Sequence, residues 1–173
     1  QSPIDILIAN AGVGGGQSLA SLAGEDTATA SLILRTNVLG VVHTVGPLMP
    51  LFLARGKGHI VIVGSLAGFA GLPDSPAYSA SKAAVRAYGQ GLRRLAAASG
   101  VKVTVVSPGF VDTPMSASLP FRGPFTWSAE RAAAYIHKGL ERGKGEIVFP
   151  LPLALAMGFV SILPVRAADF LLS

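Results

Sequence analysis

The stretch AYSASKAAV, residues 77–85, places a tyrosine and a lysine one helical turn apart. If this stretch is helical, the side chains of Tyr78 and Lys82 face the same region. A phenol is a poor base at neutral pH, but a nearby ammonium favours the phenolate and lowers the pKa of the phenol. The pair can therefore move a proton onto or off an alcohol oxygen, and Ser65, at the end of a predicted strand, can hold that oxygen by a hydrogen bond.

The same residues allow other interpretations. A half-exposed tyrosine beside a solvated lysine needs no function at all. Ser79 and Lys82 form an SxxK pattern, but the SDN and KTG motifs that accompany it in serine acyl transferases are absent from the sequence. The run GVGGGQ from Gly12 to Gln17 is a partial dinucleotide-binding fingerprint, with Gln17 in place of the third glycine. Asn37 lies in a predicted helix, where asparagine is disfavoured, so we also consider it for a functional role.

Composition narrows the classes of function. The chain has 173 residues, of which 50% are hydrophobic and 13% charged, and this predicts a folded chain with a buried core. The absence of cysteine excludes disulfides, thiolate catalysis and cysteine zinc sites, and it fits a reducing cytoplasm. His43, His59 and His137 show no ligand spacing, so we predict no metal site. The net charge is +5, but the basic residues are scattered, which argues against nucleic-acid binding.

The elements that must position the candidate residues alternate between strands and helices. Short β-branched runs predict buried strands, and longer apolar-periodic stretches predict helices. The predicted strands are 4–10, 58–65, 101–108 and 145–150; the predicted helices are 25–55, 77–98 and one capped by Ser128. This order predicts an α/β fold, a partial Rossmann-like doubly wound parallel sheet of about four strands with flanking helices. Ligands bind beyond the carboxyl ends of such strands, which here are Asn10-Ala11-Gly12, Ser65 and Pro108-Gly109.

Two segments have less regular patterns. Residues 110–127 are rich in proline and glycine and follow a strand, as a mobile lid does. We assign residues 1–150 to one domain portion and residues 151–173 to an apolar tail, in which we expect a helix. The tail could cover the substrate pocket, pack on a partner subunit, lie in a membrane interface or span a membrane.

Taken in order, these motifs resemble those of the short-chain dehydrogenase/reductase family. The resemblance runs from residue 4 to about residue 115 and rests on ANAG at 9–12, Asn37-Val38-Leu39-Gly40, Ser65, Tyr78-x-x-x-Lys82 and Pro108-Gly109. It implies the C-terminal portion of a Rossmann-type domain. It also implies an NAD(P)-dependent oxidoreductase that interconverts an alcohol and a ketone or aldehyde.

The resemblance implies a role for each matching residue. Tyr78 is the implied acid–base residue, Lys82 lowers its pKa and binds the nicotinamide ribose, and Ser65 orients the carbonyl or alcohol. Asn37 is expected to hold a water in a proton relay. The cofactor is NAD or NADP, which the sequence does not distinguish. Its expected contacts are Asn10, Ala11, Gly12, Tyr78, Lys82, Pro108, Gly109, Val111 and Thr113.

The sequence departs from the family pattern in two places. Ala9 stands where the family has the first asparagine of NNAG, and the strand–TGxxxGxG–helix that opens the family is not in this sequence. We therefore expect a truncated chain that is inactive alone, with an exposed apolar edge on its first strand. The alternative is a non-catalytic remnant that acts as a dimerisation or interaction module.

The resemblance also bears on partners and location. The intact parent is expected to form a homodimer or homotetramer, because the family pairs through the two long helices, here 25–55 and 77–98. Its substrate is expected to be a small molecule, and the apolar tail suggests a lipid-like one. We expect a cytoplasmic protein that can contact a membrane peripherally through residues 151–173.

Overall fold

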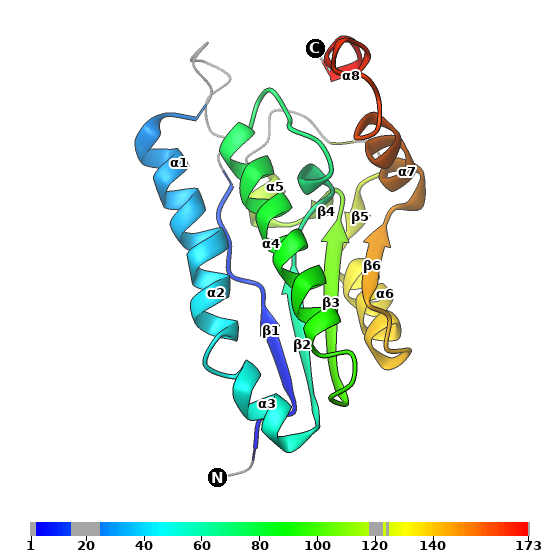
Figure 1. Ribbon diagram of the computed structural model, residues 1–173. Helices are drawn as coiled ribbons and strands as arrows, with labels where there is room; N and C mark the ends of the chain where they lie inside the picture. The colour runs from blue at the N-terminus through cyan, green and yellow to red at the C-terminus, as the bar shows by residue number, and fades with distance from the viewer. Residues whose placement is uncertain (1–2, 15–24, 118–122, 124, 173) are drawn as a thin grey trace.

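Four parallel strands form a single sheet in the computed structural model, which describes residues 3–14, 25–117, 123 and 125–172 (Figure 1). The order across the sheet is β1-β2-β3-β6, and each neighbouring pair is parallel. The strands are β1 (Ile6–Ala9), β2 (Gly58–Val63), β3 (Val101–Pro108) and β6 (Glu146–Phe149). The predicted α/β fold with about four parallel strands is confirmed.

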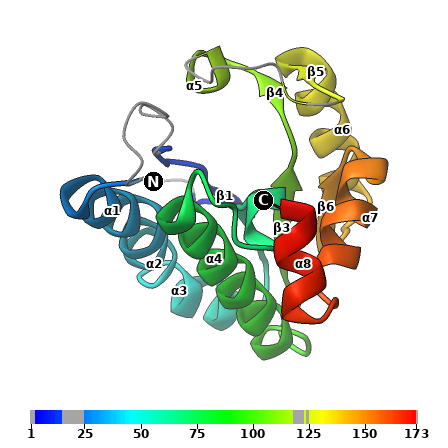
Figure 2. The same cartoon turned by 90° about the horizontal axis from the view of Figure 1, so that it is seen from above.

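Helices cover the two faces of this sheet unequally. On one face lie α4 (Pro76–Leu95) and the run of helices that precedes β2, and on the other lies α6 (Ala129–Glu141) (Figures 1 and 2). The larger core packs helix residues such as Val45 and Phe52 against Ile60 and Ile62 of β2. Burial of such apolar side chains is worth roughly 1.5–3 kcal/mol each, so this layer contributes substantially to the stability of the fold.

The edge position of β1 corrects one prediction. We expected residues 4–10 to be buried, but Ile4, Ile6 and Ile8 are 50%, 55% and 55% exposed. Side chains alternate between the faces of a strand, and only the face carrying Ala9 packs into the core. Since β1 lies at the end of the sheet order, the apolar edge expected from the sequence is present.

The predicted helix 25–55 is divided into shorter segments. They are α1 (Thr27–Leu34), a π-helical turn (Arg35–Leu39), α2 (Gly40–Val45) and α3 (Met49–Arg55). The break before α3 falls at Pro47, whose ring nitrogen has no hydrogen to donate. By length and composition the run Thr27–Arg55 is apolar enough to cross a membrane, yet part of it forms the core described above.

The remaining elements follow the predictions closely. Helix α4 ends at Leu95, before the predicted end, and Gly100 then turns the chain with φ +76°. Ser128 caps α6 as predicted, accepting a hydrogen bond from the Arg131 amide at 3.2 Å. His59 is a buried core residue whose Nε2 lies 2.8 Å from Thr104 Oγ1.

The segment 110–127 and the tail contain short elements. They are β4 (Val111–Asp112), α5 (Pro114–Ala117), β5 (Trp127–Ser128), α7 (Leu151–Val160) and α8 (Val165–Leu172). Residues 118–122 and 124 lie outside the described residues, so the predicted lid stays a prediction. The expected apolar helix after the last strand is confirmed as α7, and the tail contains a second helix, α8.

Candidate active site

The carboxyl ends of β1, β2 and β3 meet at one rim of the sheet, as the sequence predicted. Ser65 follows β2, and its Oγ lies 3.5 Å from the carbonyl oxygen of Pro108 at the end of β3. A methyl group built on Gly12, after β1, would lie 3.2 Å from Asn37 Oδ1 and 3.5 Å from Lys82 Nζ. The parallel order of the strands thus gathers residues that are far apart in sequence into one site.

Tyr78 enters this rim from the first turn of α4. The Ser65 side chain is near enough to the Tyr78 phenol to affect its pKa, so the structure brings these two predicted residues together. Burial raises the pKa of Tyr78 above its ordinary value of 10.0, and the Ser65 side chain opposes this only in part. At neutral pH the phenol therefore keeps its proton.

Burial and Ser65 set this direction, so the expectation that Lys82 lowers the pKa of Tyr78 stays a prediction. The Lys82 Nζ lies 5.6 Å from the centroid of the Tyr78 ring, but removal of the phenol from water has the larger effect. The spacing of two residues on a helix shows that they can meet, whereas the degree of burial depends on what packs over them.

Lys82 is itself a buried cation. Its side chain is 6% exposed, and its Nζ donates a hydrogen bond to the Val63 carbonyl at 3.1 Å. Burial lowers the pKa of Lys82 from 10.5 to about 8, because the ammonium has lost most of its hydration. At neutral pH most of the lysine therefore still carries its charge, and its ammonium is held by the end of β2.

Asn37 lies in the π-helical turn and is 1% exposed. Its Oδ1 accepts from the Val13 amide at 2.8 Å, and its Nδ2 donates to the Val13 carbonyl at 2.9 Å and to Ser81 Oγ at 3.0 Å. The Ser81 hydroxyl in turn donates to the Tyr78 carbonyl at 2.7 Å. Asn37 therefore ties the loop after β1 to the helix of Tyr78, and its implied water relay stays a prediction.

Sequence reasoning missed the part that one serine and one glycine play around this helix. Ser79 Oγ accepts from the Leu72 amide at 3.1 Å, so this hydroxyl anchors the loop after Ser65, which does not favour the acyl-transfer interpretation. A Cβ on Gly68 would lie 2.6 Å from the carbonyl carbon of Lys82 and 2.7 Å from the Ala83 nitrogen. The backbone of the turn at 66–68 thus packs directly on the backbone of α4.

The other residues expected to contact a cofactor lie around the same rim. The Gly109 amide donates to the Phe149 carbonyl at 2.7 Å, which closes the rim beside β6. The Thr113 amide donates to Ser116 Oγ at 2.9 Å and so fixes the start of α5. Asn10 and Ala11 are exposed after β1, and Val111 opens β4. Their cofactor contacts stay predictions, and Gly15, Gly16 and Gln17 of the partial fingerprint lie outside the described residues.

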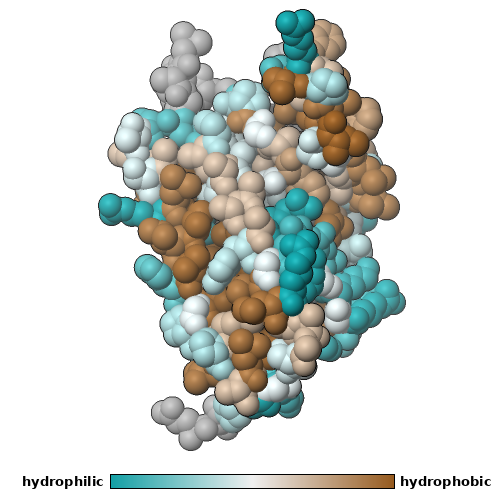
Figure 3. Space-filling model, in the orientation of Figure 1, coloured by the Kyte–Doolittle hydropathy of each residue, from teal (hydrophilic) through white to brown (hydrophobic). Residues whose placement is uncertain are grey.

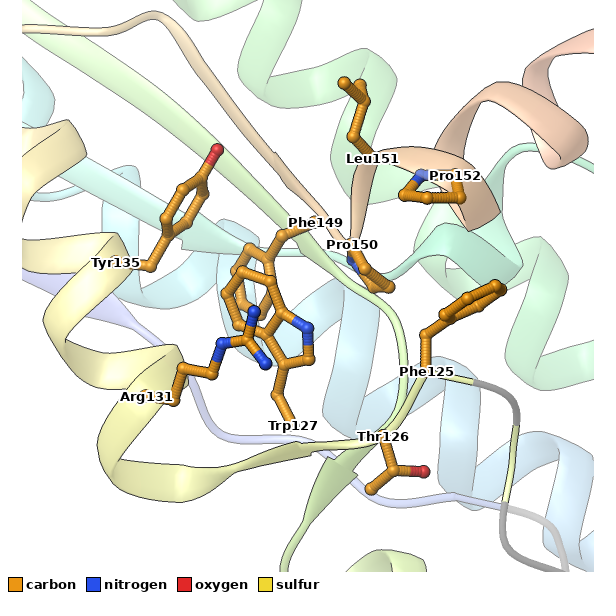
Figure 4. A pocket seen from close by; sticks show the side chains of 9 residues that line it. All are labelled: Phe125, Thr126, Trp127, Arg131, Tyr135, Phe149, Pro150, Leu151 and Pro152. Atoms are coloured by element: carbon orange, nitrogen blue, oxygen red, sulfur yellow. The ribbon is translucent and has the colours of Figure 1, made fainter.

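A cavity of about 440 Å³ lies beyond the end of β6, and neither Tyr78 nor Lys82 lines it (Figure 4). Its aromatic wall is Trp127 stacked on Phe149, with 4.8 Å between the ring centroids. The guanidinium of Arg131 lies 4.0 Å from the centroid of the Trp127 ring. Sequence analysis did not find this cavity, since its walls come from the irregular segment 125–127, α6 and the start of the tail.

Comparison with known sequences points in the same direction as the geometry. Residues 1–122 match the family described as short chain dehydrogenase. An "uncharacterized oxidoreductase" of Myxococcus xanthus is 38% identical over 161 residues, which are 93% of this chain and 62% of that protein. The chain therefore spans about three fifths of the length of this curated relative.

Solved structures with the same fold include complexes with nicotinamide cofactors. A short chain dehydrogenase from Burkholderia cenocepacia in complex with NADP has a TM-score of 0.82 and 28% identity, covering 98% of this chain and 70% of that one. A short chain dehydrogenase/reductase from Burkholderia phymatum in complex with NAD has a TM-score of 0.76 and 24% identity, covering 97% of this chain and 66% of that one. At this lower identity the likeness shows the fold alone.

Proposed function

This chain belongs to the short-chain dehydrogenase family, and on that premise we propose that it carries the acid–base centre of an NAD- or NADP-dependent oxidoreductase that interconverts an alcohol and a ketone or aldehyde. The observation that carries the proposal is the gathering of three residues at one rim: the Ser65 side chain acts on the Tyr78 phenol, and the Lys82 Nζ lies 5.6 Å from the centroid of the Tyr78 ring. In the proposal the carbonyl oxygen of the substrate lies between the hydroxyls of Ser65 and Tyr78.

In the proposed mechanism each residue acts on the substrate oxygen. Ser65 donates a hydrogen bond to the carbonyl oxygen and orients it. Tyr78, which is protonated at neutral pH because its pKa is raised by burial, delivers a proton to that oxygen during reduction. When bound, the nicotinamide supplies the hydride. Lys82 holds its ammonium beside the Tyr78 ring and stabilises the phenolate left behind.

Gly12 brings the backbone after β1 close to the groups that the family resemblance places beside a cofactor. A Cβ at Gly12 would lie 3.2 Å from Asn37 Oδ1 and 3.5 Å from Lys82 Nζ. A larger residue there would crowd both groups, so the absence of a side chain keeps this side of the rim open to a ligand. The solved relatives in complex with NADP and with NAD support either nicotinamide as the cofactor.

The cofactor proposal predicts tight binding of NADH or NADPH to the full-length product of the gene that encodes this chain. We expect nicotinamide fluorescence to change on titration, and Gly12→Val to weaken binding at least about 10-fold by filling the space beside Lys82. Addition of ketones or aldehydes should oxidise the bound cofactor, followed at 340 nm. Unchanged affinity in Gly12→Val would remove Gly12 from the site, and no binding of either cofactor would refute the proposal.

The contact of Gly68 with α4 gives a second prediction. In Gly68→Ala the new methyl group meets backbone atoms of Lys82 and Ala83 at 2.6–2.8 Å, so the turn must move and take Ser65 away from Tyr78. We expect a loss of about 1–3 kcal/mol of stability and about a 10-fold lower kcat. Gly71→Ala is the matched control, because a Cβ there meets no atom within 4 Å. Equal kcat values for the two variants would mean that Ser65 is not held by this contact.

We further propose that two exposed apolar surfaces mediate assembly and membrane contact. Leu32, Leu39 and Leu51, on the helices before β2, are 56%, 49% and 63% exposed, which supports a homodimer or homotetramer through this face (Figure 3). This face equally suits the alternative, a non-catalytic dimerisation module. Sedimentation analysis tests the assembly, and the activity assay above separates the two functions.

We also propose that the protein is cytoplasmic and that its tail, residues 151–173, contacts a membrane surface or a lipid-like substrate. Ile162, Val165 and Phe170 are 78%, 74% and 82% exposed at the end of the chain. Exposed apolar patches mark sites of protein, ligand or membrane interaction. Co-sedimentation with anionic lipid vesicles tests the membrane contact. If the protein does not sediment with the vesicles, the tail packs instead on a partner subunit or on the substrate.

A further inference from the structure

Two adjacent acidic residues cap two different helices. Asp26 caps its own helix α1, with Oδ1 accepting from the Thr29 amide at 2.7 Å. Glu25, the residue before it, reaches across to α4. One carboxylate oxygen of Glu25 accepts from the Ala77 amide, and the other accepts from the Tyr78 amide at 3.2 Å.

Helix α4 depends on this distant carboxylate because its own start supplies no cap. Within the described part of the chain, the side chain of the N-cap residue Ser75 makes no capping hydrogen bond, and Pro76 has no amide hydrogen. The next two amides, of Ala77 and Tyr78, both donate to Glu25. A carboxylate at this position also opposes the positive end of the helix dipole.

The result is that the peptide groups on both sides of the Tyr78 side chain are held. The Tyr78 amide is held by Glu25, and the Tyr78 carbonyl accepts from Ser81 Oγ, which is itself bonded to Asn37. Glu25 precedes α1 and Asn37 lies in the π-helical turn that follows α1. The same run of chain therefore fixes both ends of the residue whose hydroxyl must point at Ser65.

We propose that Glu25 is the positioning residue of Tyr78, holding the first turn of α4 so that the Tyr78 hydroxyl stays directed at Ser65. This inference rests on the proposed function for its catalytic consequence, but the contact itself does not. A carboxylate that merely stabilised the helix would affect unfolding without affecting the environment of the phenol. The experiment therefore needs a readout at Tyr78 as well as one of turnover.

The test uses Glu25→Ala, Glu25→Gln and, as the matched control, Asp26→Ala in the full-length gene product. Asp26→Ala removes a helix cap of the same kind, from the neighbouring residue, on α1 alone. Protein labelled with ¹³C at the tyrosine hydroxyl-bearing carbon shows signals from Tyr78, Tyr88 and Tyr135 among its tyrosines, and single Tyr→Phe variants assign these three. Turnover and KM are measured with the same proteins.

We expect Glu25→Ala to shift or broaden the Tyr78 signal, leaving the signals of Tyr88 and Tyr135 in place. In the same variant kcat is expected to fall about 10- to 100-fold, with KM for the cofactor changed less than about twofold. Glu25→Gln keeps one acceptor oxygen and is expected to restore part of kcat. Asp26→Ala is expected to lower thermal stability with the Tyr78 signal and kcat essentially unchanged.

The outcomes separate this proposal from the proposed function. If Glu25→Ala and Asp26→Ala have the same effect on the Tyr78 signal and on kcat, Glu25 is an ordinary helix cap and the proposal is overturned. If the wild-type protein has no oxidoreductase activity, the proposed function fails, while the Tyr78 signal still reports whether Glu25 positions the phenol. An unchanged signal in Glu25→Ala would overturn the proposal whatever the activity.

Discussion

Replacement of Tyr78 with phenylalanine is expected to lower the kcat of the full-length gene product about a thousandfold. The variant loses the proton that the phenol delivers to the substrate oxygen, and a positioned general acid contributes roughly 10²–10⁴ to the rate. Phenylalanine keeps the ring that packs 5.6 Å from Lys82 Nζ. Ser65 Oγ still accepts from the Ala67 amide at 3.1 Å, so the fold has little reason to change.

The control for this experiment is on the same helix. Tyr88 packs against the core of the sheet and is not near the rim, so Tyr88→Phe should keep kcat within about twofold. Cofactor affinity and the thermal midpoint should be close to wild type in Tyr78→Phe. Full activity in that variant would exclude Tyr78 as the acid–base residue and with it the proposed mechanism.

Replacement of Lys82 with methionine is expected to abolish turnover and at the same time to stabilise the fold. The pKa of Lys82 is lowered from 10.5 to about 8, so at pH 7 the charged side chain is destabilised by burial, by about 3 kcal/mol. Methionine has a similar length and no charge, but it loses the hydrogen bond to the Val63 carbonyl, which offsets about 1.5 kcal/mol. The net gain in the free energy of unfolding is about 1.5 kcal/mol.

The gain in the free energy of unfolding of Lys82→Met depends on pH. The folded-state pKa lies below that of the unfolded chain, so the unfolded state binds more protons between the two values and wild-type stability rises from pH 8 to pH 10.5. The advantage of Lys82→Met in urea unfolding should therefore be largest at pH 7, disappear at about pH 9.5 and become a deficit by pH 10.5, where the lost hydrogen bond to Val63 outweighs the remaining cost of burial. Lys57→Met is the control, because the Lys57 side chain is 76% exposed. A destabilised Lys82→Met at pH 7 would mean that the ammonium is compensated in the fold.

A stabilising change that abolishes activity is the expected signature of a functional residue. Lys82 lies at a position where its charge weakens the fold, and in the proposed mechanism its ammonium stabilises the phenolate that forms when Tyr78 releases its proton. The same compromise is absent at His59, which is buried in the core and meets Thr104. His59 does no chemistry in the proposed mechanism, and burial lowers its pKa so that it stays neutral.

Most of the architecture could be predicted because its signals are local. The runs of Val and Ile in β2 and β3 and the cap at Ser128 each depend on residues only a few positions apart. The meeting of Ser65, Tyr78 and Lys82 could also be predicted, since parallel strands present their carboxyl ends at one rim. The exposure of Ile6 and Ile8 could not be read from β1 itself, because burial of a strand depends on its neighbours and on what covers each face.

What the sequence by itself determined is the order of the elements and the identity of the residues that meet at the rim. What only the tertiary structure decided is how these residues are held and charged. Glu25 meets Tyr78 across 53 positions and Asn37 meets Val13 across 24, and no periodic pattern encodes such contacts. The pKa of Tyr78 is raised with a lysine one helical turn away, because burial removes the phenol from water, and spacing along one helix does not report burial.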